Sequence, residues 1–326
     1  DKEQTTNVVL VNFKSEPLPR ALREDVMAEF TGIVTSSVSS MVSERLTEVA
    51  KDPNCPFVAA YLNYGSYLMS KTMESFQLVV VPKDGKTIEA TQAAYREVLR
   101  AIKTGFNASE FQRAKDNLLA QVEARKENKN KTPNDQLGPQ LYRHFLDGVA
   151  CPNIEVEYEL DKQLCAQITV DMINQMVTQL VEEGGKNTVI LSMNREAEGV
   201  ALPDAEALKA AILAVNGEQF VAYVDNAKNA PLVTVLPKKG KIVKETKNAK
   251  YGYTELTLSN GARVLMKQTN YKADQILFEA SSVGGKSLYG KSEDTNFKLL
   301  DAAIEMSGLG NFDNTELTKA LAGKKV

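Results

Sequence analysis

Apolar and polar positions in the first 200 residues follow two periods, and each period predicts a kind of element. Apolar runs rich in β-branched and aromatic residues indicate buried strands, and apolar positions that recur every three or four residues indicate helices. The predicted strands span 7–13, 57–70, 73–82 and 187–193, and the predicted helices span about 20–51, 88–104, 108–122, 134–146 and 170–182. This order predicts an α+β fold, in which helices pack on a layered antiparallel sheet, rather than a regular βαβ alternation.

The pattern changes after residue 200. An alanine-rich helix is predicted at 204–215, and an Asn-Gly turn at 259–261 predicts a hairpin with strands at 253–258 and 262–267. A further strand at 275–283, a helix at about 295–307 and a capping box at 313–316 follow. We therefore predict an α+β domain at 1–200, a helical and basic linker at 201–250, and the truncated start of a second, similar domain at 251–326.

Charge is unevenly distributed along the chain. The 326 residues include 39 basic and 42 acidic side chains, a formal net charge of −3, but residues 238–272 carry nine basic and two acidic groups. This segment could bind a polyanion, since Lys and Arg neutralise phosphates. It has one arginine, Arg263, and few aromatic side chains on which bases would stack. We favour a solvated, lysine-rich linker that stays extended and predict no nucleic-acid partner.

Histidine and cysteine limit the metal chemistry available to the chain. The single histidine, His144, excludes the two-histidine zinc motifs H-E-x-x-H and H-x-x-E-H. Cys55, Cys151 and Cys165 form no C-x-x-C pair and predict neither a zinc knuckle nor a disulfide framework, and their roles stay open. No apolar run approaches the ~20 residues of a membrane-spanning helix, so no span is predicted. The chain begins with Asp1 rather than Met and ends at Val326, where a new strand is expected to begin. We therefore expect an internal fragment of a longer protein.

Two local patterns resemble ligand-binding motifs. Ala280-Ser-Ser-Val-Gly-Gly-Lys-Ser287 fits a relaxed phosphate loop, in which Lys286 would contact phosphate oxygens and Ser287 magnesium. The strict first glycine is missing, so a glycine-rich loop between strand and helix is the favoured interpretation. His144 begins a run similar to H-x-x-E-H, but Gly148 replaces the second histidine. We expect a partly exposed helical histidine there.

A row of acidic residues offers a third possible site. Glu155, Glu157, Glu159 and Asp161 alternate along a segment that we interpret as strand-like or as a loop. Alternate positions would place these carboxylates on one side, where they repel one another, so a solvated edge is favoured over carboxylate catalysis. No catalytic, cofactor-binding or metal-binding residue is therefore predicted in this chain.

An ordered set of segments resembles the M16 family of pitrilysin- and insulinase-like zinc metallopeptidases, particularly the long single-chain bacterial type. The first 200 residues resemble the family's C-terminal-type α+β domain, and residues after 250 resemble the opening of a second peptidase-like half. The matching segments are MVSERLTE at 41–48, AAYLNYG at 59–65, SFQLVVVP at 75–82, FNASEFQRAK at 106–115, ITVDMIN at 168–174, LTLSNGARV at 256–264 and SVGGKSL at 282–288.

The resemblance implies a fragment of a zinc-dependent metalloendopeptidase that cleaves peptides inside a clamshell chamber. The family's zinc motif, H-x-x-E-H with a downstream Glu, lies in an N-terminal domain that no segment of this chain matches. The equivalent helix of the second half, at 297–306, has no histidine. The chain would thus supply chamber wall and linker, bind no zinc and be inactive alone, whereas the longer protein would bind zinc and peptide substrates.

Other properties stay open at this level. The alternative within the family is a non-catalytic scaffold or partner-binding subunit, and an H-x-x-E-H motif upstream of Asp1 would favour the enzyme over it. The bacterial relatives suggest the periplasm or cell envelope of a Gram-negative bacterium, with the cytoplasm as the other possibility. Substrate preference and oligomeric state do not follow from the sequence.

Overall fold

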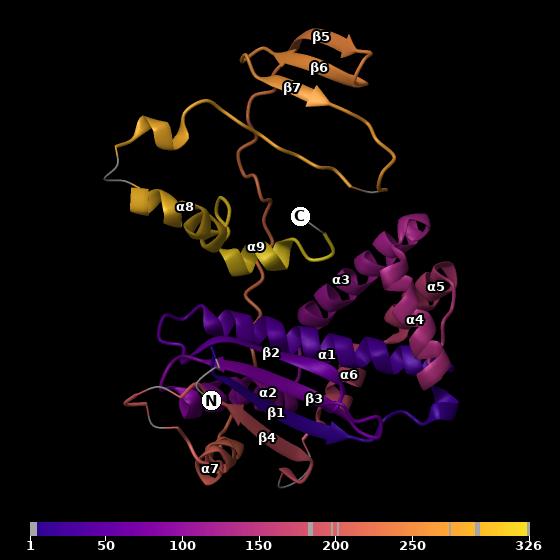
Figure 1. Ribbon diagram of the computed structural model, residues 1–326, viewed down its shortest axis with the longest axis vertical. Coiled ribbons are helices and arrows are strands. Elements are labelled where there is room, and N and C mark those ends of the chain that lie inside the picture. Colours follow the sequence, from indigo (N-terminus) through magenta and orange to yellow (C-terminus); the bar gives the residue numbers. More distant parts are fainter. Residues whose placement is uncertain are drawn as a thin grey trace. The chain divides into compact units, whose positions relative to one another are not determined.

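A computed structural model describes residues 5–181, 185–196, 198–200, 202–273, 275–290 and 294–324 of the chain (Figure 1). It divides into two compact units. The first comprises residues 1–122, 134–226 and 322–326, and the second comprises residues 123–133 and 227–321.

Four antiparallel strands form the sheet of the first unit. They are β1 (Val8–Ser15), β2 (Phe57–Ser66), β3 (Glu74–Pro82) and β4 (Thr188–Met193), and their order in the sheet is β2-β3-β1-β4. On the central strand β1, Val9, Val11 and Phe13 alternate with other residues and are fully buried on one face. All four strands were predicted from the apolar runs, and the pairing of β2 with β3 confirms the predicted hairpin.

Helices make up most of the rest of the first unit. They are η1 (Arg20–Leu22), α1 (Val26–Ala50), α2 (Thr87–Thr104), α3 (Ala108–Glu127, which ends in the second unit), α4 (Asn134–Asp147), α5 (Ile154–Gln167), α6 (Val170–Val177) and α7 (Ala205–Asn216). Side chains fix several starting points, because an N-cap oxygen accepts a hydrogen bond from an otherwise unpaired backbone N–H. Asp25, Asn153, Thr169 and Asp204 do this for α1, α5, α6 and α7.

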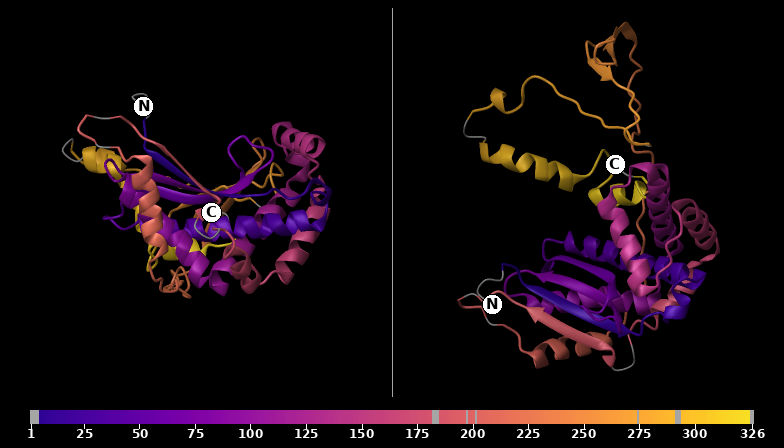
Figure 2. Two further views of the ribbon diagram at one scale, coloured as in Figure 1. Left: turned by 90° about the horizontal axis from the view of Figure 1, so that it is seen from below. Right: turned by 45° about the vertical axis from the view of Figure 1, so that its right-hand side comes forward.

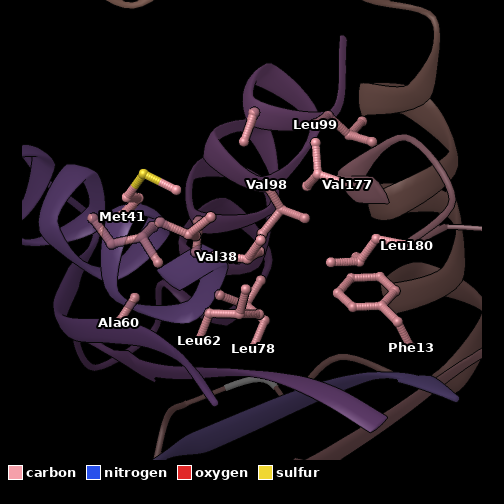
Figure 3. Packing of buried hydrophobic residues seen from close by; sticks show 14 of the residues in the cluster. Phe13, Val38, Met41, Ala60, Leu62, Leu78, Val98, Leu99, Val177 and Leu180 are labelled. Atoms are coloured by element: carbon pink, nitrogen blue, oxygen red, sulfur yellow. The ribbon is translucent and has the colours of Figure 1, made fainter. Parts of the chain in front are cut away.

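The hydrophobic core lies between the sheet and two of these helices. Helices α1 and α2 pack against one face of the sheet, where α1 contacts β2 and α2 contacts β3 (Figure 2). Figure 3 shows Val38 of α1 and Val98 of α2 directed toward Leu62, Leu78 and Phe13 of the strands. All five side chains are buried. This packing is the antiparallel sheet with helices on it that the sequence predicts.

The second unit is built around a smaller sheet. Its strands are β5 (Ile242–Asn248), β6 (Tyr253–Leu258) and β7 (Arg263–Met266), in that order, and η2 (Lys129–Lys131), η4 (Gly285–Leu288), α8 (Asp294–Ser307) and α9 (Asn314–Ala320) complete it. The predicted Asn-Gly hairpin joins β6 to β7, and Gly261 has φ 86°. Asp313 and Glu316 form the predicted capping box of α9. Among the described apolar side chains of this unit, Leu256 and Phe312 are the buried ones.

Three sequence predictions are wrong. Residues 155–161 belong to helix α5 and not to a strand-like segment or loop, because Asn153 caps the helix and acidic residues in its first turn favour its N-terminus. Residues 275–283 form no strand in the described part of the chain, since no neighbouring strand pairs with them. The basic segment 238–272 is not simply an extended linker. Its residues 242–248 form β5, whose backbone pairs with β6 while its lysines remain exposed.

Two helix boundaries also differ from the prediction. The helix expected at 20–51 begins at Val26, because the Asp25 side chain accepts a hydrogen bond from the Met27 N–H. The helix expected at 170–182 ends at Val177, and residues 182–184 lie outside the described residues.

Candidate functional site

The residues singled out for metal chemistry are not brought together. His144 lies exposed in the last turn of α4, and its Nδ1 is 2.8 Å from the Val149 carbonyl oxygen. Of the described carboxylates, imidazole and thiols, no three lie close enough to hold a metal ion. A catalytic zinc site needs three protein ligands, so the side chains that the structure describes do not fit the zinc centre of an M16 peptidase.

The segment similar to a phosphate loop has local hydrogen bonds of its own. Gly284 and Gly285 have φ values of 126° and 71°, in the region that favours glycine. The Ser287 hydroxyl donates to the Gly284 carbonyl oxygen at 3.1 Å, and a short 3₁₀ turn follows the glycines in place of a long helix. The Lys286 side chain lies outside the described part. A phosphate loop requires a preceding strand, and residues 275–283 do not form one.

Neither the cysteines nor the acidic row form a reactive cluster among the described residues. Cys55 and Cys165 are buried, Cys151 is exposed, and all three are free thiols. Burial is the main cause that raises the pKa of Cys165 to about 11, so this thiol stays protonated and is a poor nucleophile at neutral pH. In the acidic row, Asp161 is buried on the inner face of α5 whereas Glu159 is exposed, so the four carboxylates do not share one side.

Sequence reasoning missed a buried ion pair between α1 and α3. The guanidinium of Arg45 donates to both carboxylate oxygens of Glu110, at 2.7 and 2.8 Å, and to the Gly105 carbonyl oxygen at 3.0 Å. Their side chains are 1% and 2% exposed. The sequence does indicate that Arg45 is buried, because it lies on the same helical face as Val38 and Met41, where an apolar residue is expected.

This pair continues into a network that holds the chain segment after α7. The Arg45 guanidinium stacks 4.4 Å from the centre of the Tyr223 ring, and the Tyr223 hydroxyl is 2.9 and 2.8 Å from the Glu48 carboxylate oxygens. Arg113 of α3 pairs with Asp225 at 2.7 Å. Charge-assisted hydrogen bonds of this kind are the stronger ones, so residues 223–225 are fixed on α1 and α3.

A pocket of about 330 Å³ opens elsewhere in the first unit. Its wall comes from the first turns of α1, the tip of the β2-β3 hairpin and the end of α4. Glu74 accepts a hydrogen bond from the Tyr64 hydroxyl, and burial, the main cause, together with this carboxylate, raises the pKa of Tyr64 above its usual value. Lys71 pairs with Asp147 at 2.8 Å. The pocket is therefore lined by side chains of both charge types.

Comparisons with known proteins find similarity to zinc proteases. No protein-family model matches the sequence. The zinc protease PQQL-like of Arabidopsis thaliana is 27% identical over 213 residues, and the probable zinc protease PqqL of Escherichia coli K12 is 23% identical over 330 residues. A predicted insulinase family protease from Yersinia pestis has a similar fold, with a TM-score of 0.55 at 14% identity over 66% of this chain and 44% of that chain. The chain is thus similar in sequence to proteins named as zinc proteases and similar in fold to an insulinase family protease.

The relationship extends over the whole chain but only part of each relative. The crystal structure of the periplasmic protease PqqL from Escherichia coli matches 98% of this chain with a TM-score of 0.62 at 20% identity, and 35% of that protein is covered. The two curated relatives match 65% and 100% of this chain, which spans 22% and 34% of their lengths. The resemblance to M16 peptidases and the α+β fold inferred from the sequence are thus confirmed. In the described part of the chain, no helix is long and apolar enough to cross a bilayer.

Proposed function

We propose that this chain is a non-catalytic portion of an M16-type zinc metalloendopeptidase. Residues 1–200 would form the C-terminal-type domain of the first half and part of the wall of the peptide chamber. Residues 201–250 would link the halves, and residues 251–326 would begin a second half without a zinc motif. By itself the chain binds no catalytic zinc and cleaves no peptide. The complete enzyme would act on peptides, in the periplasm or cell envelope.

One observation carries this proposal. A chain that matches PqqL over 98% of its length has a single histidine, and that histidine lies exposed at the end of α4 with its Nδ1 beside a backbone carbonyl. A catalytic zinc that activates water in a protease is held by three protein ligands, and in M16 chemistry two of them are histidines. Residues outside this chain would therefore supply the zinc ligands and the catalysis of the complete enzyme.

The test compares this chain with a longer protein that includes the upstream region. Zinc content is measured by mass spectrometry, and cleavage of a fluorogenic peptide is followed with and without a chelator. We expect chelator-sensitive cleavage from the longer protein alone. Stoichiometric zinc together with cleavage by the 326-residue chain would refute the proposal. A longer protein with neither zinc nor cleavage would favour the non-catalytic scaffold.

A further inference from the structure

The pocket at the start of α1 has an excess of cations. Three basic side chains line it, Arg23, Lys71 and Arg143, and two acidic ones, Glu74 and Asp147. Glu74 already accepts a hydrogen bond from Tyr64. The lining therefore has three basic and two acidic side chains, and Asp147 is the carboxylate that pairs with one of the basic ones, Lys71.

Two of these cations have assigned partners and one does not. Lys71 donates to the Asp147 carboxylate at 2.8 Å, and Arg23 donates to the backbone oxygens of Leu18 and Asp147 at 2.9 and 3.0 Å. Arg143 forms no hydrogen bond or ion pair with any described residue. It is four residues before Asp147 on α4, so both side chains lie on the face of the helix that lines the pocket.

The remaining wall of the pocket combines apolar and hydroxyl-bearing side chains. Pro17, Leu18, Ala28, Met73 and Val149 supply the apolar part, and Thr31, Thr35, Tyr64 and Ser66 supply the hydroxyls. The volume of about 330 Å³ is at the lower end of the range for small-ligand sites, about 300–1,000 Å³. A cavity that is partly apolar and has the Arg143 guanidinium in its lining suits a ligand that combines an apolar group with a carboxylate, since Arg binds carboxylates in a bidentate manner.

We propose that this pocket binds the C-terminal residue of a peptide, with the free carboxylate on Arg143 and an apolar side chain in the cavity. The proposal rests on the proposed function, because a protease chamber is where peptides with free C-termini are present. The proposed site would lie on the wall of the peptide chamber and would include none of the residues that cleave the peptide. Asp147 acts against binding, because it competes for the same cations.

The experiment measures fluorescence anisotropy of two labelled peptides with the 326-residue chain. Both carry the label at the N-terminus and end in leucine, one as the free acid and the other as the carboxamide. We expect the free acid to bind about tenfold more tightly, the effect of one charge-assisted pair. Arg143→Gln should abolish that preference. Asp147→Asn should increase the affinity for the free acid, because it removes a carboxylate that pairs with Lys71 and attracts Arg143 electrostatically.

The matched control is Arg195→Gln, which removes the same charge from a half-buried arginine that pairs with Asp84 outside the pocket. It should leave the preference for the free acid intact. Circular dichroism melts verify that each variant is folded, which is expected because Arg143 is exposed. Equal binding of acid and amide, no binding of either, or an equal loss in Arg195→Gln would overturn the proposal. None of these results bears on zinc or cleavage in the longer protein, so this inference and the proposed function fail separately.

Discussion

The buried pair Arg45–Glu110 allows a quantitative prediction about the stability of the first unit. Glu110→Gln keeps the shape of the side chain but removes the negative charge, which leaves the Arg45 guanidinium buried without its counter-charge. Both side chains are at most 2% exposed, so water cannot replace the lost interaction. Breaking a buried pair on one side costs about 3–5 kcal/mol. Since domains are stable by about 5–15 kcal/mol, this is a large part of the total.

Urea unfolding followed by circular dichroism measures the effect. We expect Glu110→Gln to reduce the free energy of unfolding by about 3–5 kcal/mol. The double variant Arg45→Met with Glu110→Gln should lose less than the sum of the two single variants, by about 1–3 kcal/mol, because it no longer buries an unpaired cation. The control Arg96→Gln breaks the Arg96–Glu218 pair, whose side chains are 39% and 37% exposed, and should cost less than about 1 kcal/mol. A loss from Glu110→Gln no larger than that of Arg96→Gln would refute the reasoning.

Three further measurements test the core, a buried acid and the second unit. Leu78→Ala in the sheet should lower the free energy of unfolding by about 2–5 kcal/mol, whereas the exposed Leu141→Ala should change it by less than about 0.5 kcal/mol, as urea titration would show. Burial is the main cause that raises the pKa of Glu97, so its ionisation opposes folding above its unfolded pKa of about 4.3 and has no effect well below it. The free energy of unfolding of Glu97→Gln, relative to that of the wild type, should therefore be higher at pH 7 than at pH 4. An equal difference at the two pH values would contradict this. Trypsin should cleave first at the exposed Lys238 or Lys239, outside regular elements, and mass spectrometry would detect early cuts in α1 or α2 if that were wrong.

Local patterns predicted many of the elements in both units because each of these elements satisfies its own pattern. The apolar run at 7–13 became the central strand β1, and the Asn-Gly turn became the β6-β7 hairpin. Capping signals at Thr169 and Asp313 located helix starts, since a side-chain oxygen there accepts a backbone hydrogen bond within a few residues. Interactions between residues only a few positions apart can therefore be predicted from the sequence.

Long-range polar partners could not be predicted in the same way. Arg45 is 65 residues from Glu110 and 178 residues from Tyr223, and no local rule selects those partners among 42 acidic side chains and 11 tyrosines. The pocket is also formed by segments distant in sequence, since Arg143 and Tyr64 belong to α4 and β2. The sequence shows that Arg45 lies on an apolar face, which predicts that a buried charge needs a partner without identifying it.

An apolar pattern predicts that a surface packs against another part of the protein, but it does not identify the packing partner. Helix α4 was correctly predicted from Leu137, Leu141 and Phe145, yet all three side chains are exposed. The apolar run at 275–283 was predicted as a strand on the same kind of evidence, and Phe278 is exposed there too. Strand formation needs a partner for every backbone hydrogen bond, whereas a helix satisfies its own. This difference explains why the unpaired run at 275–283 is irregular while the equally uncovered α4 remains a helix.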